Sequence, residues 1–160
     1  MVQGSSRLAT AIHAMALIMV AEGEESGRPV TSDEMAMNIG AHPVHVRRVM
    51  GSLREVGLVI SQPGPGGGWM LVSHPESVTL GDIYRAVETE SPFGMPPSPP
   101  EACCRFAPQL PHALEFALER AEAAMIQELS GVTLADLIDS AKGTLGGVDR
   151  APSVSTIRDM

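Results

Sequence analysis

The chain has 160 residues, of which 44% are hydrophobic, and it carries a formal net charge of −8 at pH 7. This composition suits one folded domain of ordinary size with an accessory element, and it argues against disorder of the whole chain. Because the overall charge repels phosphate, it also argues against non-specific coating of nucleic acid, so DNA binding would have to depend on local arginines.

The first expected element is a helix from Ser5 or Ser6 to about Glu22. Its segment 8–21 is nearly all apolar. The run is too short to cross a membrane, and acidic residues follow it where a signal peptide would have its cleavage site. We therefore expect a helix that is covered on more than one side, which burial against a second subunit would explain.

Two shorter helices follow with the spacing of a helix-turn-helix. Thr31 as N-cap and Glu34 three residues later indicate a capping box, and Gly40 is the expected stop of this helix. Pro43 suits the first position of the next helix, which Gly57 ends. The expected core-facing stripe of this helix consists of Val46, Val49, Met50, Leu53 and Val56.

A glycine-rich turn at residues 63–68 separates two short apolar segments, 58–60 and 69–72. This pattern predicts a β-hairpin, with Trp69 bracing it from beneath. A phosphate-binding loop of a nucleotide-binding enzyme would lead into a helix and usually carry a lysine, and this turn does neither. The helices and the hairpin together predict a winged helix-turn-helix.

The second half of the chain is expected to be helical. Thr79 and Asp82 indicate a capping box for a helix to about residue 88. Seven prolines in residues 91–111 rule out regular structure there. A long helix at about 111–129 and a last helix that starts at Thr133 and ends at Gly143 then follow.

The expected fold class is mainly α with a small antiparallel β wing, in which a winged helix-turn-helix is followed by a long dimerisation helix. The expected parts are the DNA-binding domain (5–90), a proline-rich loop with Cys103 and Cys104 (91–110), the dimerisation helices (111–142) and a flexible tail (143–160). The expected dimer contacts form one stripe of the long helix: Leu114, Ala117, Leu118, Ala121, Met125 and Leu129.

The solvent face of the second short helix carries arginines that suit DNA. A helix of this kind fits the major groove, where arginine bonds to guanine and short side chains touch thymine methyl groups. Arginines on an arbitrary helix are more often only a solvated face, but the flanking helix and hairpin favour DNA binding here. Base reading is assigned to Val44, His45, Arg47 and Arg48, and phosphate contact to Arg54. The full candidate set is Thr31, Ser32, Pro43, Val44, His45, Arg47, Arg48, Ser52, Arg54, Gln62, Gly66 and Gly67.

Several motifs in this order resemble the Rrf family of bacterial winged-helix transcriptional repressors, the relatives of IscR, NsrR and CymR. They are segments 6–8, 43–48, 57–59, 64–69 and 79–87, together with the turn at His13. The arginine pair behind Pro43 is most similar to the cluster-free YwnA-like branch. The resemblance covers about residues 5–142 and implies a homodimer, joined through the long C-terminal helix, that binds a palindromic operator and represses transcription.

The chain departs from the family pattern in two places. Members with an iron–sulfur cluster supply three spaced cysteines, whereas this chain has only the adjacent Cys103 and Cys104, so no cluster and no other cofactor is expected. The wing of many members also has an arginine where this chain has Pro63. Gln62 is then the nearby polar substitute, and the wing is expected to contact the DNA backbone.

The two cysteines leave alternatives open. They are too few and too close for a disulfide framework, which fits a reducing cytoplasm. A loop thiol beside Arg105 is a candidate redox sensor, and two ordinary free cysteines are the other interpretation. A metal site with His112 lacks regular ligand spacing, so no metal is expected.

The sequence therefore predicts a cytoplasmic, DNA-binding transcriptional regulator whose partners are double-stranded DNA and a second copy of the chain, with no membrane segment. The alternative is a winged-helix protein-interaction module whose basic face meets an acidic protein. The sequence does not favour an enzyme, because it contains no nucleophile arranged with a base and an acid, no spaced metal ligands and no phosphate-binding loop.

Overall fold

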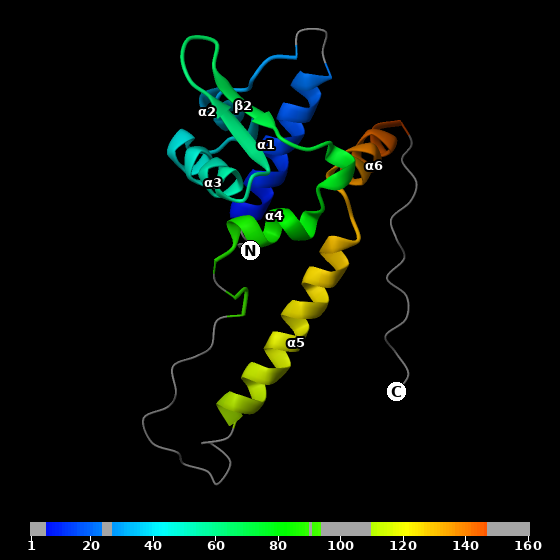
Figure 1. Ribbon diagram of the computed structural model, residues 1–160. Coiled ribbons are helices and arrows are strands. Elements are labelled where there is room, and N and C mark those ends of the chain that lie inside the picture. Colours follow the sequence, from blue (N-terminus) through cyan, green and yellow to red (C-terminus); the bar gives the residue numbers. More distant parts are fainter. Residues whose placement is uncertain (1–5, 24–26, 90, 94–109, 147–160) are drawn as a thin grey trace.

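The computed structural model describes residues 6–23, 27–89, 91–93 and 110–146, and the structural statements that follow concern these residues (Figure 1). They form six α-helices, one 3-10 helix and one two-stranded antiparallel sheet. In chain order the elements are α1 (Ser6–Glu22), α2 (Ser32–Ile39), α3 (Pro43–Glu55), β1 (Val59–Gln62), β2 (Gly68–Leu71), η1 (Pro75–Ser77), α4 (Leu80–Val87), α5 (Leu110–Ser130) and α6 (Leu134–Gly146). The predicted fold class, mainly α with a small antiparallel β wing, is confirmed, and the role of the long helix in dimerisation stays a prediction.

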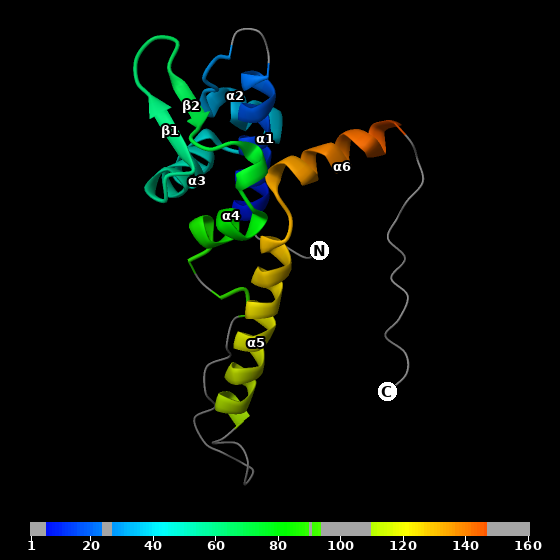
Figure 2. The same cartoon turned by 45° about the vertical axis from the view of Figure 1, so that its right-hand side comes forward.

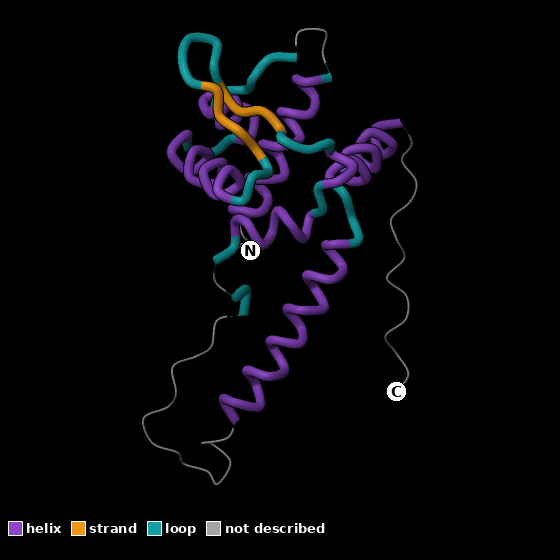
Figure 3. Tube along the Cα trace, viewed as in Figure 1, coloured by secondary structure: helices purple, strands orange, loops and turns teal. Residues whose placement is uncertain are grey.

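Helix α1 is the centre of the N-terminal half, because α2, α3, α4 and β2 all pack against it (Figure 3). This arrangement explains why its sequence is apolar on more than one side. The fully buried side chains of this core include Met15, Ile18, Met35, Val46, Val49, Met50, Leu53, Val59 and Ile83.

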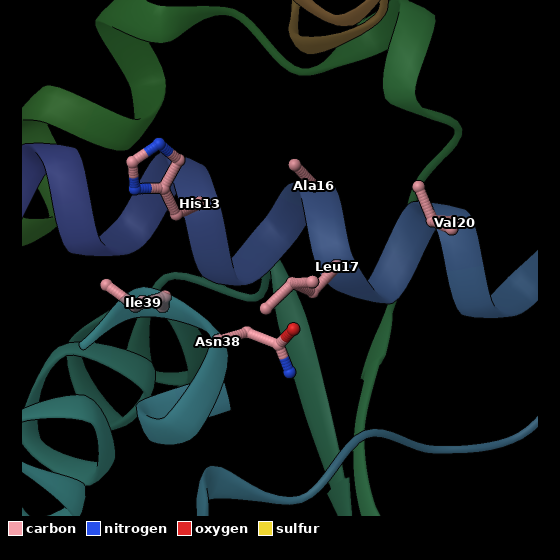
Figure 4. A pocket seen from close by; sticks show the side chains of 6 residues that line it. All are labelled: His13, Ala16, Leu17, Val20, Asn38 and Ile39. Atoms are coloured by element: carbon pink, nitrogen blue, oxygen red, sulfur yellow. The ribbon is translucent and has the colours of Figure 1, made fainter. Parts of the chain in front are cut away.

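One side of α1 stays open within the described chain. His13 is exposed and Val20 is 54% exposed, and both border a hollow of about 290 Å³ between α1 and α2 (Figure 4). Leu17 points from α1 towards Asn38 and Ile39 of α2 across this hollow. Burial of α1 against a second subunit, which the sequence suggested, remains a prediction. Among the described helices, none is both long and apolar enough to cross a lipid bilayer.

Helix α2 begins and ends where the sequence predicts. The Thr31 hydroxyl accepts a hydrogen bond from the Glu34 backbone N–H at 3.2 Å, and Gly40 ends the helix with φ of 71°. The expected capping box is only half right, because the Glu34 carboxylate instead accepts two hydrogen bonds from Arg28, at 2.6 and 2.9 Å. A charged guanidinium is a stronger donor than a backbone N–H, which explains the difference.

Helix α3 is capped by a residue that the sequence analysis missed. The His42 Nδ1 accepts a hydrogen bond from the Val44 backbone N–H at 3.2 Å, and Pro43 is the first helical residue.

The predicted core stripe of α3 is buried as far as Leu53, but Val56 is 57% exposed. The assignment of Val56 to the core was wrong because the helix ends at Glu55, so Val56 leaves the helical stripe.

The hairpin is attached to the segment before α2 by backbone hydrogen bonds. The Val30 N–H donates to the Trp69 carbonyl at 3.1 Å, and the Trp69 N–H donates to the Val30 carbonyl at 2.9 Å. Trp69 also donates from Nε1 to the Ser32 hydroxyl at 2.9 Å, so it braces the hairpin as predicted. Gly68 permits this close approach, because a Cβ there would lie 2.7 Å from the Val30 carbonyl oxygen.

Helix α4 connects the N-terminal half to α5. Thr79 and Asp82 form the predicted capping box. A Cβ at Gly81 would overlap the Ser130 hydroxyl, so glycine lets α4 and the end of α5 touch. Arg85 adds a hydrogen bond to Ser130 at 3.2 Å. From this contact α5 extends away from the remaining helices (Figures 1 and 2).

The C-terminal prediction needs one correction. Helix α6 begins after Thr133, as expected, but it passes through Gly143 and ends at Gly146. Gly143 has no positive φ, and a glycine lowers helix stability without ending the helix when its backbone stays helical. The predicted tail, 143–160, therefore starts too early. Its residues 147–160 lie outside the described residues, as do residues 94–109 of the proline-rich segment.

We expect Gly68→Ala to lower the free energy of unfolding by about 1–3 kcal/mol, because the new methyl group would collide with the Val30 backbone. Gly51→Ala is the matched control. It lies in α3, where no atom comes within 4 Å of the place that the added methyl group would take, and it should stabilise the protein by about 0.5–1 kcal/mol. Urea unfolding followed by circular dichroism measures both. Equal effects of the two substitutions would contradict the close approach at Gly68.

Candidate nucleic-acid interface

The predicted DNA-binding residues lie mainly on one side of the molecule, formed by α3, the start of α2 and the hairpin. This side faces away from α6 in both ribbon views (Figures 1 and 2). Arg47 and Arg48 are exposed on α3, and Val44 is 55% exposed one turn earlier. The helix therefore presents a basic surface with a short apolar side chain at its start, as major-groove reading requires.

A hollow of about 330 Å³ lies between these three elements. It brings together the predicted residues Thr31, Arg47, Gln62 and Gly67. Other lining residues were not predicted as DNA contacts, among them Asp33 and Ser61. Their only signal in the sequence was proximity to predicted site residues.

The arginines of α3 differ in their hydrogen-bond and ion-pair partners. Arg47 Nη2 donates to Asp33 Oδ1 at 2.8 Å, which ties α3 to the first turn of α2. Arg54 Nη1 lies 3.5 Å from the Ser61 hydroxyl of β1. Within the described part of the chain, no hydrogen bond or ion pair is found for the guanidinium of Arg48. Arg48 can therefore turn freely towards a ligand.

Acidic groups also lie at the start of α2. The hydrogen bonds from Arg28 hold the pKa of Glu34 below its usual value, so this carboxylate is charged at neutral pH. Asp33 is its neighbour in the same turn. The candidate interface is thus a mixed surface, in which one basic side chain, Arg47, already has an acidic partner.

Two predicted DNA contacts are not supported by the geometry. The His45 ring is half-buried, and its Nε2 lies 3.2 Å from the hydroxyl of Thr10, which is buried in α1. The Ser32 side chain is buried as the acceptor of the Trp69 hydrogen bond. Both side chains are occupied by contacts within the protein, because each lies on the inner side of its helix.

The remaining candidates take varied positions. Ser52 is half-buried and donates to the Arg48 carbonyl at 3.4 Å, and Pro43 is half-buried at the start of α3.

The two candidate glycines lie in the turn of the hairpin. Gly66 has φ of 76°, which favours glycine, and a Cβ at Gly67 would overlap the Gln62 carbonyl. The turn itself therefore requires these glycines, whereas the sequence analysis named them only as candidate DNA contacts.

The predicted dimer stripe lies on the extended helix α5. Leu114, Ala117 and Ala121 are exposed, and the other members are half-buried. Phe116, which the sequence analysis left out, is 63% exposed on the same helix. Cys103 and Cys104 lie outside the described residues.

Comparison with known proteins gives consistent results. Residues 4–140 match the Rrf2 family, described as iron-dependent transcriptional regulators. YwnA of Bacillus subtilis strain 168 is 29% identical over 135 residues, which cover 84% of this chain and 96% of YwnA. The transcriptional repressor NsrR of Streptomyces coelicolor is 30% identical over 142 residues, covering 85% and 88%. The structure of CymR, the global cysteine regulator of B. subtilis, is 26% identical with a TM-score of 0.58, covering 88% and 98%.

The iron in that description has no matching ligand set among the described residues. Within them, no three His, Cys, Asp or Glu side chains lie together as metal ligands. The whole chain has two cysteines, and they are adjacent. The described side chains therefore do not fit an iron site, and we assign no role to iron or to a cluster.

We expect Thr10 and His45 to be energetically coupled, because their hydrogen bond joins α1 to the start of α3. Thr10→Val and His45→Ala should each lower the free energy of unfolding, and the double variant should cost less than the sum by about 0.5–1.5 kcal/mol. Urea unfolding of the four proteins measures this coupling, and Thr10→Ser serves as a control that keeps the hydroxyl. Additive effects would show that the hydrogen bond is not important in solution.

Proposed function

Because the chain belongs to the Rrf2 family of transcriptional regulators, we propose that it binds a palindromic operator as a homodimer and represses transcription. The chain is a DNA-binding regulator and not an enzyme, as its relatives indicate. The observation that supports the proposal most directly is the position of exposed Arg47 and Arg48 on α3, next to the hairpin. A local basic surface of this kind allows specific binding despite the net charge of −8.

We assign separate roles to the parts of this surface. The start of α3 enters the major groove, where Arg47 and Arg48 bond to base edges and Val44 contacts a thymine methyl group. Arg54, farther along the helix, contacts phosphate. The hairpin follows the DNA backbone through Gln62 and the turn at Gly66, since no wing arginine is present.

Helix α5 supports the homodimer. It extends away from the other described helices and exposes the apolar side chain of Leu114 on the predicted stripe (Figure 2). A long helix with an exposed apolar stripe is marginally stable in water unless a partner covers it. Ala117 and Ala121 lie one turn apart and are small enough for a second helix to approach closely. Two copies joined in this way would present two α3 helices to a palindrome.

We also propose that a thiol of Cys103 or Cys104 makes DNA binding sensitive to oxidants. This part rests on the sequence alone, namely on two adjacent cysteines beside Arg105 in a proline-rich segment.

Arg47→Ala/Arg48→Ala should weaken binding to the operator by at least about tenfold, because each arginine that reads a base discriminates by about 1–3 kcal/mol. The operator is first selected from a random pool of duplexes with the wild-type protein, and affinity is measured by fluorescence anisotropy. Arg120→Ala/Lys142→Ala removes the same charge on α5 and α6 and should change affinity by less than about twofold. Equal losses in both double variants would refute the assignment of α3. If the wild type selects no duplex, the result would favour the alternative, a winged-helix module that binds an acidic protein.

Ala121→Glu should convert the dimer to a monomer, since it places a charge in the middle of the proposed helix contact. Ala123→Glu is the matched control on the same helix, because it is exposed and points roughly 200° away from Ala121. Sedimentation velocity measures the two species, and circular dichroism checks that both variants are folded. A dimer that survives Ala121→Glu, or one that both substitutions disrupt equally, would contradict the proposed stripe.

A further inference from the structure

The ion pair between Asp33 and Arg47 joins the first turn of α2 to the exposed face of α3. The two side chains meet at 2.8 Å and line the hollow beside the hairpin. They are 70% and 55% exposed, so the pair is open to a ligand. Asp33 thus places a carboxylate on the surface that we propose for DNA, where it repels phosphate.

The pair leaves most of the Arg47 guanidinium available. Arginine has five N–H donors in a fixed plane, and the bond to Asp33 uses the Nη2 group through a single contact. Bidentate recognition of guanine needs two donors. Arg47 can therefore keep its bond to Asp33 while it reads a base.

We propose that Asp33 is a specificity-determining positioning residue, which orients Arg47 for a base edge and disfavours phosphate at the same place. The inference rests on the proposed function of this surface. Holding the long arginine side chain in one orientation removes part of the entropy cost of binding, so the matching base is bound more tightly. A phosphate brings a full negative charge close to the Asp33 carboxylate, whereas a guanine edge does not, so unrelated DNA is bound more weakly.

Glu34 provides an internal comparison. It follows Asp33 in the same turn of α2 and is also paired with an arginine, but its partner Arg28 precedes α2 and does not line the hollow. Both acids lie at the helix start, where negative charge is favourable. A role in helix stability or in overall charge is therefore shared by both residues, while control of an α3 arginine belongs to Asp33.

The test compares Asp33→Asn with Glu34→Gln, each of which removes one negative charge and one ion pair. Binding is measured by anisotropy over a range of salt concentrations with two duplexes. One is the duplex that the wild type selects from a random pool, and the other is an unrelated duplex of the same length and base composition.

For Asp33→Asn we expect the selected duplex to be bound about three- to fivefold more weakly, and the unrelated duplex to be bound about twofold or more tightly. The salt dependence on the unrelated duplex should become steeper by about 0.9, because Arg47 gains a phosphate contact. Glu34→Gln should change both affinities in the same direction and keep their ratio within about twofold. In an Arg47→Ala background, Asp33→Asn should no longer change the ratio of the affinities for the two duplexes. Thermal unfolding checks that all variants are folded.

The inference fails if Asp33→Asn leaves the ratio of the two affinities unchanged, if Glu34→Gln changes it equally, or if the effect persists without Arg47. These outcomes differ from a failure of the proposed function, in which the wild type selects no duplex at all.

Discussion

The attachment of the hairpin to the segment before α2 is the constraint on which the candidate interface depends. An isolated two-stranded hairpin is at best marginally stable in water. Here the two backbone hydrogen bonds between Val30 and Trp69, and the bond from the Trp69 indole to Ser32, fix it to the helix-turn-helix. Ser32 and Trp69, which make these contacts, also line the hollow beside Arg47. The shape of the surface is therefore decided at Gly68, where only a residue without a Cβ allows the two backbones to meet.

The charge distribution explains how an acidic chain can present a surface for a polyanion. The arginines of α3 lie together on one side, so their attraction acts locally while the net charge limits unspecific association. Arg47 and Arg28 have acidic partners, and Arg48 has none among the described residues. Exposed ion pairs of this kind contribute at most about 1 kcal/mol to stability. Their main physical effect is on the orientation of the side chains and on the local field.

The sequence was sufficient for features that depend on neighbouring residues, such as the N-cap at Thr31 and the helix stop at Gly40. The same reasoning failed where a helix continued through a glycine, as at Gly143, because small energy differences decide helix ends. Contacts between distant segments were not accessible from the pattern. Thr10 and His45 are 35 residues apart and no periodicity relates them, so His45 was assigned to DNA although its ring faces α1. The family resemblance supplied the order of the elements, but such pairings depend on how the helices of this chain pack.

The contact between α4 and α5 determines how the two halves of the molecule can influence each other. Helix α4 packs against α1, α3 and α5, and its buried residues Ile83 and Val87 belong to the same core as α3. At Gly81 the approach to Ser130 leaves no room for a side chain, and packed surfaces of this kind shift as units because they do not compress. A movement of α5 near this contact must therefore displace α4 as well. Since α4 touches α3 directly, the orientation of the basic helix is mechanically connected to the helix that we propose for dimerisation.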